Sequence, residues 1–421
     1  MNKRHFLKTM ALTGLASSEI STNIDGLLNA VKNQSPTQLA QNEDFWASLR
    51  NEYKLSPDYI NLENGYYCLS PRSVLSVFQK NVEEINLKNS YYMRTRQFYD
   101  QAEIRAKLAN YVGCEPEEII VTRNTTESLD TVIAGYDWKP GDEAVMAYQD
   151  YGAMLDMFKL QAKRYGMVNR IVSLPNHPSS DDEIVQLYAQ AINPKTRLLM
   201  VCQMVNITGH ILPIKKICEM AHAKGVEVMV DGAHAVSHIN FKISDLGCDY
   251  YGSSLHKWLS VPLGVGILYV KKEKIKSIWP IFGDMNFDDN DIRKLNHTGT
   301  HPVHTVLTIG AAIDFANKIG IENKEARLRF LQQYWTKQVR EISNIMVNTP
   351  KENERACGIA NVGISKMKPA EMAKFLLEKY KIWTVAIDVA NVQGCRITPN
   401  IYTSTNELEQ FIKALKEMAQ G

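Results

Sequence analysis

Short β-rich runs alternate with amphipathic stretches over residues 101–270, and this alternation limits the folds open to the chain. The strand candidates are residues 118–122, 143–147, 170–174, 197–203, 227–230 and 265–270, and the helix candidates are residues 101–112, 125–134, 153–165, 182–192 and 214–224. Strands that alternate with helices pair in parallel through crossover connections. The sequence therefore predicts an α/β fold with a mostly parallel sheet flanked by helices.

The pattern changes after Gly299, where long helical segments at 303–318 and 323–343 precede a smaller α/β portion that ends in a helix at 405–418. A chain of 421 residues should form at least two domains, because one domain usually holds roughly 100 to 200 residues. We expect the folded part to begin at Phe45. The expected parts are a leader or disordered tail (1–40), an N-terminal segment that packs with the small domain (41–74), a large domain (75–300) and a small C-terminal domain (301–421).

Composition excludes several classes of function. A hydrophobic fraction of 45% and a charged fraction of 22% are typical of a soluble globular protein. The net charge of +2 argues against a nucleic-acid partner, and no apolar run approaches the roughly 20 residues that would span a bilayer. The seven cysteines include no C-x-x-C pair, which argues against a disulfide framework or a zinc knuckle. We expect no metal site at the grouped histidines, which are residues 234, 238, 297, 301 and 304.

The amino terminus is basic and then mildly apolar. Its Lys3-Arg4-His5-Phe6-Leu7-Lys8 run resembles a twin-arginine export leader, although the first arginine is replaced by lysine and the apolar stretch is short. This resemblance implies a periplasmic location. The alternative is a tail on a cytoplasmic protein.

Lys257 is the strongest candidate for a catalytic residue. It lies in the segment 253–258, downstream of Asp231, which closes the apolar run 226–230. A lysine amine can form a Schiff base with pyridoxal phosphate (PLP), and an acidic residue facing the pyridine nitrogen keeps the ring protonated. The alternative is a surface lysine and the strand-ending aspartate of a doubly wound protein without any cofactor.

A phosphorylated cofactor also needs an anion site, and the segment 123–127 offers one. Asn124 and Glu127 have the spacing of a capping box at a helix start, where free N–H groups attract a phosphate. Thr125 and Thr126 would add hydroxyl groups, and Ser254 could supply another. An ordinary capped helix is the alternative.

Several ordered motifs together resemble the class V branch of fold-type I PLP enzymes, which includes aminotransferases, cysteine desulfurases and isopenicillin N epimerases. The likeness runs from about residue 59 to 418 through Asn64-Gly65, 123–128, 206–209, 231–234, His256-Lys257 and 396–399. It implies a large domain with a mostly parallel seven-stranded sheet and a smaller C-terminal α/β domain. It also implies PLP as the cofactor, an amino acid or amino-acid-containing peptide as the substrate, and a homodimer with shared active sites.

The resemblance assigns roles to individual residues. Lys257 carries the Schiff base and acts as the base for the α-proton, and Asp231 pairs with the pyridine nitrogen. Asn206 and His234 approach the phenolic oxygen, with His256 beside the cofactor. Tyr151 stacks on the ring, and Thr300 contacts the phosphate in the neighbouring subunit. Substrate is bound by Asn64, Gly65 and Arg396, and the Arg396 guanidinium would hold the α-carboxylate.

The reaction is open at this stage. Tyr151, where many members have histidine, favours the isopenicillin N epimerase-like branch and chemistry at the α-carbon through an external aldimine. Desulfurases carry a nucleophilic cysteine before the carboxylate arginine, but residues 381–390 contain none, and Cys395 should point away from Arg396 in an extended segment. Aminotransferase and C–S or β-elimination lyase chemistry are alternatives, as is an inactive PLP-binding scaffold.

Overall fold

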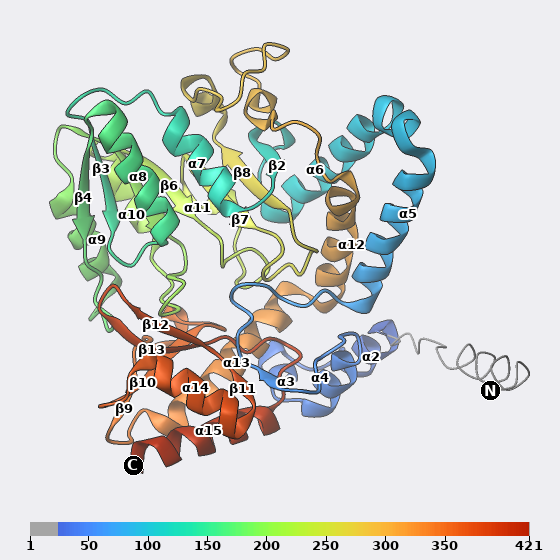
Figure 1. Ribbon diagram of the computed structural model, residues 1–421, viewed down its shortest axis with the longest axis vertical. Coiled ribbons are helices and arrows are strands. Elements are labelled where there is room, and N and C mark those ends of the chain that lie inside the picture. The colour runs from blue at the N-terminus through green and yellow to red at the C-terminus, as the bar shows by residue number, and fades with distance from the viewer. Residues whose placement is uncertain (1–23, 421) are drawn as a thin grey trace, which may run out of the picture.

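The computed structural model describes residues 24–420, and its core is a seven-stranded sheet (Figure 1). Strand β8 runs antiparallel to its neighbours β2 and β7, and the other strand pairs are parallel. The strands lie in the order β2 (Ile119–Thr122), β8 (Gly266–Val270), β7 (Tyr250–Ser254), β6 (Glu227–Asp231), β5 (Thr196–Cys202), β3 (Glu143–Ala147) and β4 (Val168–Val172). The predicted α/β fold is confirmed.

Helices cover both faces of this sheet because its central strands are apolar on both sides. In β6, Val228 and Val230 pack into one core, whereas Met229 between them packs into the other. The flanking helices are α6 (Gln97–Val112), α7 (Thr125–Gly135), α8 (Gly152–Tyr165), α9 (Asp181–Ala191), α10 (Ile214–His222) and the short α11 (Ile243–Leu246). Each predicted helix of this region is present within a few residues of its expected bounds.

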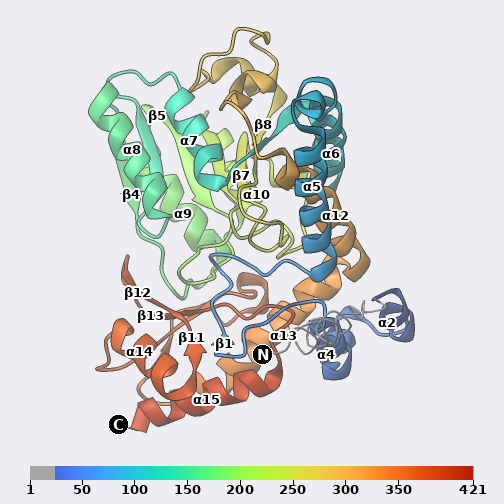
Figure 2. The same cartoon turned by 45° about the vertical axis from the view of Figure 1, so that its right-hand side comes forward.

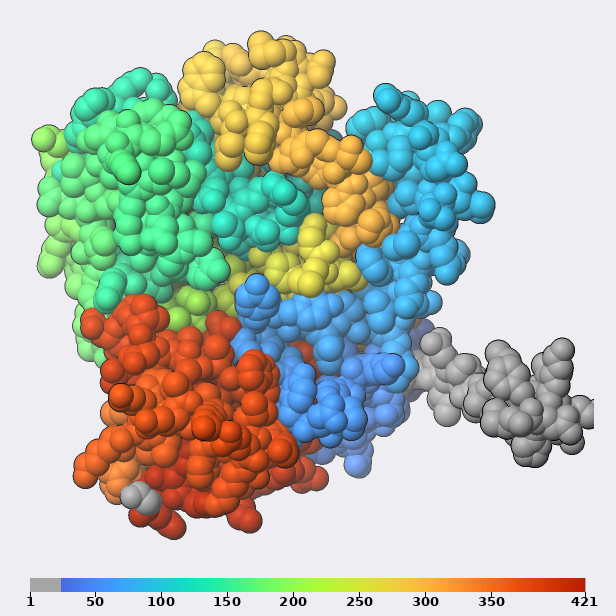
Figure 3. All heavy atoms as spheres, viewed as in Figure 1, coloured from blue at the N-terminus to red at the C-terminus, as the bar shows by residue number. Residues whose placement is uncertain are grey.

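The C-terminal part forms a second, antiparallel sheet with its own core (Figures 1 and 2). Its strand order is β12 (Val385–Val389), β13 (Val392–Ile397), β10 (Ala360–Ile364) and β9 (Ile345–Val347), and the helices packed with it are α13 (Ile321–Val339), α14 (Pro369–Tyr380) and α15 (Thr405–Gln420). Figure 3 shows this part lying directly against the large-domain segments. The smaller α/β portion that was predicted at the C-terminus is therefore present.

The segment before residue 75 pairs with the C-terminal part through a separate two-stranded sheet. Strand β1 (Ile60–Asn61) pairs in parallel with β11 (Ile382–Trp383). Helix α4 (Glu43–Arg50) makes two ion pairs, one between Arg50 and Glu407 at 2.5 Å and one between Glu43 and the buried Arg327. These contacts anchor the N-terminal segment beside α13 and α15.

Helices are already present before Phe45, so the expected start of the folded part was wrong. Helices α2 (Ile24–Ala30) and α3 (Pro36–Ala40) precede α4, and Leu39 and Ala40 are buried. A capping box between Ser35 and Gln38 starts α3. Helices this short carry little periodic signal, which is why the polar residues around position 41 seemed to mark the start of the fold. The leader-like motif lies outside the described residues.

Helix α12 (Val303–Ile319) packs against α5 (Arg72–Thr95) and α6 of the large part, before α13 enters the small part. Sequence reasoning missed α5, because few of its side chains are buried and its apolar stripe is correspondingly weak. The exact domain bounds remain a prediction. Short 3₁₀ helices lie in the connections, at η1 (Pro116–Glu118), η2 (Lys272–Ser277), η3 (Ile292–Asn296) and η4 (Asn353–Arg355).

Two structural features would mark other classes of protein, and residues 24–420 show neither. None of the helices there is both long and apolar enough to cross a bilayer. No group of three or more His, Cys, Asp or Glu side chains is placed to hold a metal ion.

Candidate active site

A cavity of about 580 Å³ lies where the large part, the N-terminal segment and the small sheet meet. Such a volume suits a cofactor together with a small substrate. Asp231 ends β6, Ser254 ends β7 and Cys202 ends β5, so the cavity opens at the carboxyl edge of the parallel strands. The predicted residues that line it are Gly65, Thr125, Thr126, Tyr151, Asn206, Asp231, His234, Ser254, His256, Lys257 and Arg396.

Two predicted residues do not reach this cavity. Asn64 is fully buried, where its amide donates to the carbonyl of Thr398 at 2.7 Å and its side-chain oxygen accepts from the Tyr402 hydroxyl at 2.7 Å. Both ends of the amide join the N-terminal segment to residues 398–402, and the predicted contact of Asn64 with substrate stays a prediction. Thr300 is exposed and lies outside the cavity of its own chain.

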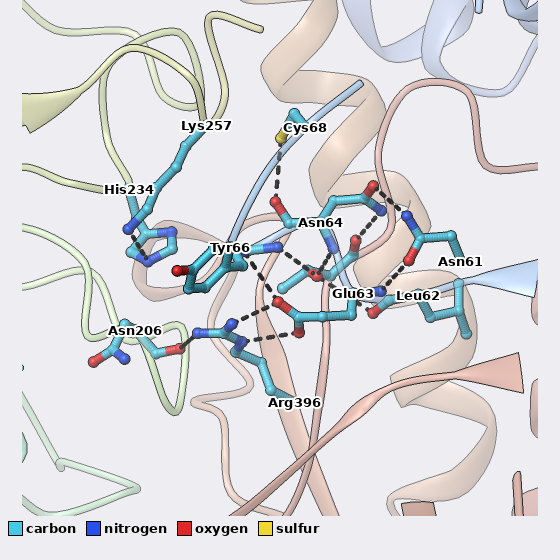
Figure 4. A network of polar contacts seen from close by, with 12 residues as sticks. Asn61, Leu62, Glu63, Asn64, Tyr66, Cys68, Asn206, His234, Lys257 and Arg396 are labelled. Atoms are coloured by element: carbon cyan, nitrogen blue, oxygen red, sulfur yellow. Dashed lines mark hydrogen bonds and ion pairs between the residues drawn. The ribbon is translucent and has the colours of Figure 1, made fainter. Parts of the chain in front are cut away.

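Lys257 lies in the turn that follows β7, and its side chain points into the cavity. Its Nζ lies 3.1 Å from Nε2 of His234 (Figure 4). Burial lowers the pKa of the Lys257 amine to about 8, while the charge of Asp231 acts in the opposite direction. About a tenth of the amine is thus unprotonated at pH 7, far more than for an ordinary lysine, and this is the form that attacks an aldehyde.

Asp231 lies on the strand next to the one that leads to Lys257, with Asp231 paired to Gly252 in the β6–β7 ladder. Its Oδ1 accepts the backbone N–H of Ala233 at 2.9 Å, which fixes the carboxylate in the turn after β6. Burial raises the pKa of Asp231, and the Ala233 hydrogen bond and the Lys257 charge oppose that rise. The carboxylate and the amine therefore line one cavity and are coupled electrostatically.

The start of α7 faces the cavity and brings Thr125 close to Ser254. Ser254 accepts the Thr125 backbone N–H at 2.9 Å and lies 2.7 Å from the Thr125 hydroxyl. Asn124 caps the helix by accepting the Glu127 N–H at 2.9 Å, but Glu127 does not complete a capping box. Its carboxylate accepts the backbone N–H of Arg123 at 2.5 Å instead, because the extended backbone at the cap brings that group within reach.

Tyr151 lies at the N-cap position of α8 and is 47% exposed. The preceding residue, Asp150, shapes this turn, because its carboxylate accepts the backbone N–H of Ala147 at 2.7 Å. The Tyr151 ring borders the cavity and is free to stack on a planar ligand.

Arg396 reaches the cavity from β13 of the small sheet. Its guanidinium is held by Glu63, with Nη2 to Oε1 at 2.5 Å and Nε to Oε2 at 3.1 Å, and Nη1 donates to the carbonyl of Asn206 at 3.2 Å (Figure 4). A Cβ on Gly65 would lie 2.9 Å from the guanidinium carbon, so any larger residue there would require the end of the Arg396 side chain to shift. Sequence reasoning did not identify Glu63, which is 333 residues away from Arg396.

Cysteines provide no activated nucleophile on the segment before Arg396. Cys395 is buried in the small-domain core, with its sulfur directed to the carbonyl of Pro369 at 3.6 Å. Its side chain therefore points away from Arg396, as the alternation of a strand requires. Cys202 does line the cavity, but burial raises the pKa of its thiol well above the usual range, so it is not a thiolate at neutral pH.

A buried lysine beside a strand-ending carboxylate, next to a helix start at the carboxyl edge of a doubly wound sheet, fits a PLP enzyme of fold-type I. The chain belongs to the aminotransferase class-V family, whose model matches residues 68–411. It is a PLP-dependent enzyme of that family.

Similar proteins fall into more than one branch. The isopenicillin N epimerase of Streptomyces clavuligerus is 25% identical, with 88% of this chain and 97% of that protein covered. The cysteine desulfurase of Dickeya dadantii is 27% identical, covering 74% and 80%. A solved structure of a C-DES variant with glycine covalently linked to the PLP cofactor has a TM-score of 0.78 and 19% identity, covering 87% of this chain and 98% of that one, which is a likeness of fold.

Proposed function

We propose that the chain binds PLP through Lys257 and acts as an epimerase or racemase at the α-carbon of an amino acid or an amino-acid-containing peptide. The observation that carries this proposal is that the Lys257 amine, the Asp231 carboxylate and the Arg396 guanidinium all line one cavity. The similarity to isopenicillin N epimerase over nearly the whole of both chains supports this branch.

The residues of the cavity fit the parts of the cofactor. The α7 N-terminus, with Thr125, Thr126 and Ser254, would hold the phosphate, and Asp231 would pair with the ring nitrogen. Tyr151 would cover one face of the ring. Bound PLP withdraws electrons from the substrate α-carbon and so weakens its bonds.

The chain itself would orient the substrate and move the proton. Arg396 would hold the α-carboxylate by charge-assisted hydrogen bonds from the small-domain side. This contact fixes the α-carbon near Lys257, whose unprotonated amine can accept the α-proton and return it. Return of the proton by Lys257 to the same face restores the starting configuration, whereas inversion requires a second donor, a side chain or water, to deliver a proton to the opposite face.

Persulfide chemistry is disfavoured, because Cys395 faces the small-domain core and residues 381–390 contain no cysteine. Transamination and C–S or β-elimination are the alternative reactions, and the similarity to a desulfurase keeps the lyase alternative open. A non-catalytic PLP-binding scaffold is the alternative outside enzymology.

Incubation with a panel of free and peptide-linked amino acids in deuterated water tests the reaction. Epimerisation predicts solvent deuterium at the α-carbon together with loss of chirality and no net change of amino group. Formation of a keto acid would instead establish transamination, and release of pyruvate or sulfide would establish elimination. A coloured protein that exchanges no α-proton with any substrate would support the scaffold alternative.

We also propose a homodimer with shared active sites. Large apolar side chains are exposed on α5–α6 and after η2, including Tyr91 (75%), Phe98 (71%), Trp279 (68%) and Met285 (97%), and a second copy could cover them. Thr300, exposed in its own chain, would then reach the phosphate site of the partner. Mixing Lys257→Ala chains with Thr300→Ala chains should give heterodimers in which one site combines Lys257 of one chain with Thr300 of the other, and PLP affinity should be restored at that site. No restoration would argue that each site belongs to one chain.

Export to the periplasm is proposed from the leader-like N-terminus alone. Cell fractionation of the full chain, compared with a Lys3→Gln, Arg4→Gln double variant, tests it. Equal distribution of both chains in the cytoplasmic fraction would favour the cytoplasmic alternative.

A further inference from the structure

Both ring nitrogens of His234 have a nitrogen-bearing neighbour. Nε2 lies 3.1 Å from Nζ of Lys257, and Nδ1 lies 3.3 Å from the indole Nε1 of Trp258. His234 is 3% exposed and Trp258 is fully buried, so water does not replace the indole at Nδ1. The contacts of the protein therefore decide where the imidazole carries its proton.

The chemistry of the indole group gives the direction of the second contact. An indole N–H can only donate, so Nδ1 of His234 must be the acceptor and carries no hydrogen. Burial lowers the pKa of His234 well below its usual range, and the nearby Lys257 charge lowers it further, so the ring is neutral. A neutral imidazole without hydrogen at Nδ1 carries its proton at Nε2, the nitrogen that faces Lys257.

Trp258 is held in place from two further directions. Its ring stacks on His238, with centroids 3.7 Å apart and planes inclined by 29°, and its carbonyl accepts a hydrogen bond from the buried amine of Lys324. The Gly358 N–H donates to Nε2 of His238 at 2.9 Å, so His238 carries its proton at Nδ1 and donates it to the His234 carbonyl at 2.8 Å. The two histidines thus have opposite tautomers.

We propose that Trp258 is a positioning residue that holds His234 in the Nε2-protonated tautomer, so that His234 donates a hydrogen bond to the Lys257 nitrogen instead of accepting its proton. A hydrogen bond donated to a nitrogen lone pair stabilises the unprotonated amine, which is the reactive form. The catalytic consequence rests on the proposed function, whereas the tautomer belongs to the folded chain with or without cofactor.

The tautomer can be read directly by NMR on the cofactor-free protein labelled with ¹⁵N-histidine. The His234 signals are assigned as those missing from a His234→Gln variant. We expect an unprotonated, pyridine-like Nδ1 and a protonated, pyrrole-like Nε2. An unprotonated Nε2, or protons on both nitrogens at neutral pH, would overturn the proposal whatever reaction the enzyme performs.

The effect on Lys257 is tested with Trp258→Phe, which keeps an aromatic ring against His238 but removes the donor. The pH midpoint for covalent capture of PLP by the cofactor-free protein should rise by about one unit, the size that one hydrogen bond carries. Trp335→Phe is the matched control. Trp335 is also fully buried, but in the small-domain core, and its indole N–H has no hydrogen-bond partner among the described residues.

The two variants separate positioning from stability. Both should lower the melting temperature through lost volume, and only Trp258→Phe should move the midpoint. A lower melting temperature with an unchanged midpoint in Trp258→Phe would reduce Trp258 to a packing residue and refute the proposal. If Trp258→Phe does not fold, the NMR measurement on the unmodified chain decides; if the chain captures no PLP at all, the proposed function fails while the tautomer is still measured.

Discussion

Glu63 and Arg396 form a buried bidentate ion pair that joins the N-terminal segment to the small sheet. Their side chains are 6% and 9% exposed, and Arg396 lines the cavity whereas Glu63 does not. The carboxylate therefore braces the guanidinium from outside the cavity. An arginine has five N–H donors, so this pair leaves donors for a second carboxylate from a substrate.

Replacing Arg396 by alanine should raise KM for amino acids at least about tenfold, because a charge-assisted contact to the carboxylate is lost. Steady-state kinetics with the substrate found by the deuterium panel measures it. Arg170→Ala, which removes a surface arginine paired with Glu143, is the control and should leave KM unchanged. An unaltered KM in Arg396→Ala would place carboxylate recognition elsewhere.

Glu63→Gln should lower the free energy of unfolding by about 3 kcal/mol, because it leaves the Arg396 charge buried without its partner. Urea denaturation measures this change. Glu84→Gln removes an exposed partner of Lys88 and should change the free energy of unfolding by less than about 1 kcal/mol. Equal effects in the two variants would contradict the bracing role of Glu63.

Borohydride reduction in the presence of PLP should label Lys257 and not Lys324. Burial lowers the pKa of both amines to about 8, but only Lys257 lines the cavity, whereas Lys324 donates to the carbonyl of Trp258. Peptide mapping by mass spectrometry locates the label. Lys257→Ala should abolish both the label and turnover, and turnover at the rate of the unmodified enzyme would refute the assignment of Lys257 as the base.

Covalent capture of PLP by the cofactor-free enzyme should speed up as the pH rises toward 8 and level off above it. The unprotonated amine attacks the aldehyde, and the pKa of Lys257 is lowered to about 8 by burial, so the reactive fraction is half-maximal near that pH and levels off above it. Stopped-flow absorbance across pH 6 to about 10 follows the rate. A rate that still climbs steeply near pH 10 would mean that the amine has an ordinary lysine pKa.

Gly65→Ala should raise KM severalfold while changing stability little, because the new Cβ would lie 2.9 Å from the Arg396 guanidinium carbon and would push it aside. Gly283→Ala is the control, since nothing lies within 4 Å of a Cβ at that position. Kinetics and thermal melting of both variants give the comparison. If Gly65→Ala and Gly283→Ala have the same KM, the Arg396 guanidinium does not hold the substrate.

The parts of the fold that sequence analysis identified are those with a strong local pattern. The strand ending at Asp231 and the helix beginning at Thr125 have an apolar run or a capping residue that can be read without a structure. Strand β7 was missed because Tyr250–Ser254 contains glycine and serines, which are poor indicators of a strand. Helix α5 was missed because few of its residues are buried.

The residues of the site also fall into those that sequence motifs can identify and those that they cannot. Lys257, Asp231 and Arg396 carry their chemistry in their side chains and could be proposed from motifs. Glu63 and Trp258 act through contacts with residues distant in the sequence, and no local pattern distinguishes them from an ordinary surface acid or a core tryptophan. Asn64, conversely, stands in a motif but uses both ends of its amide within the fold.

Opposite walls of the cavity are rooted in separate hydrophobic cores. Leu255 and Trp258, which flank Lys257, pack into the larger core, which also includes Ile359 and Val392 of the C-terminal part, whereas Cys395 and Ile397, which flank Arg396, pack into the core of the small sheet. A ligand that spans both walls would tie the two cores together as well as being held by them. Ligand binding and the packing between the two cores would then be thermodynamically linked.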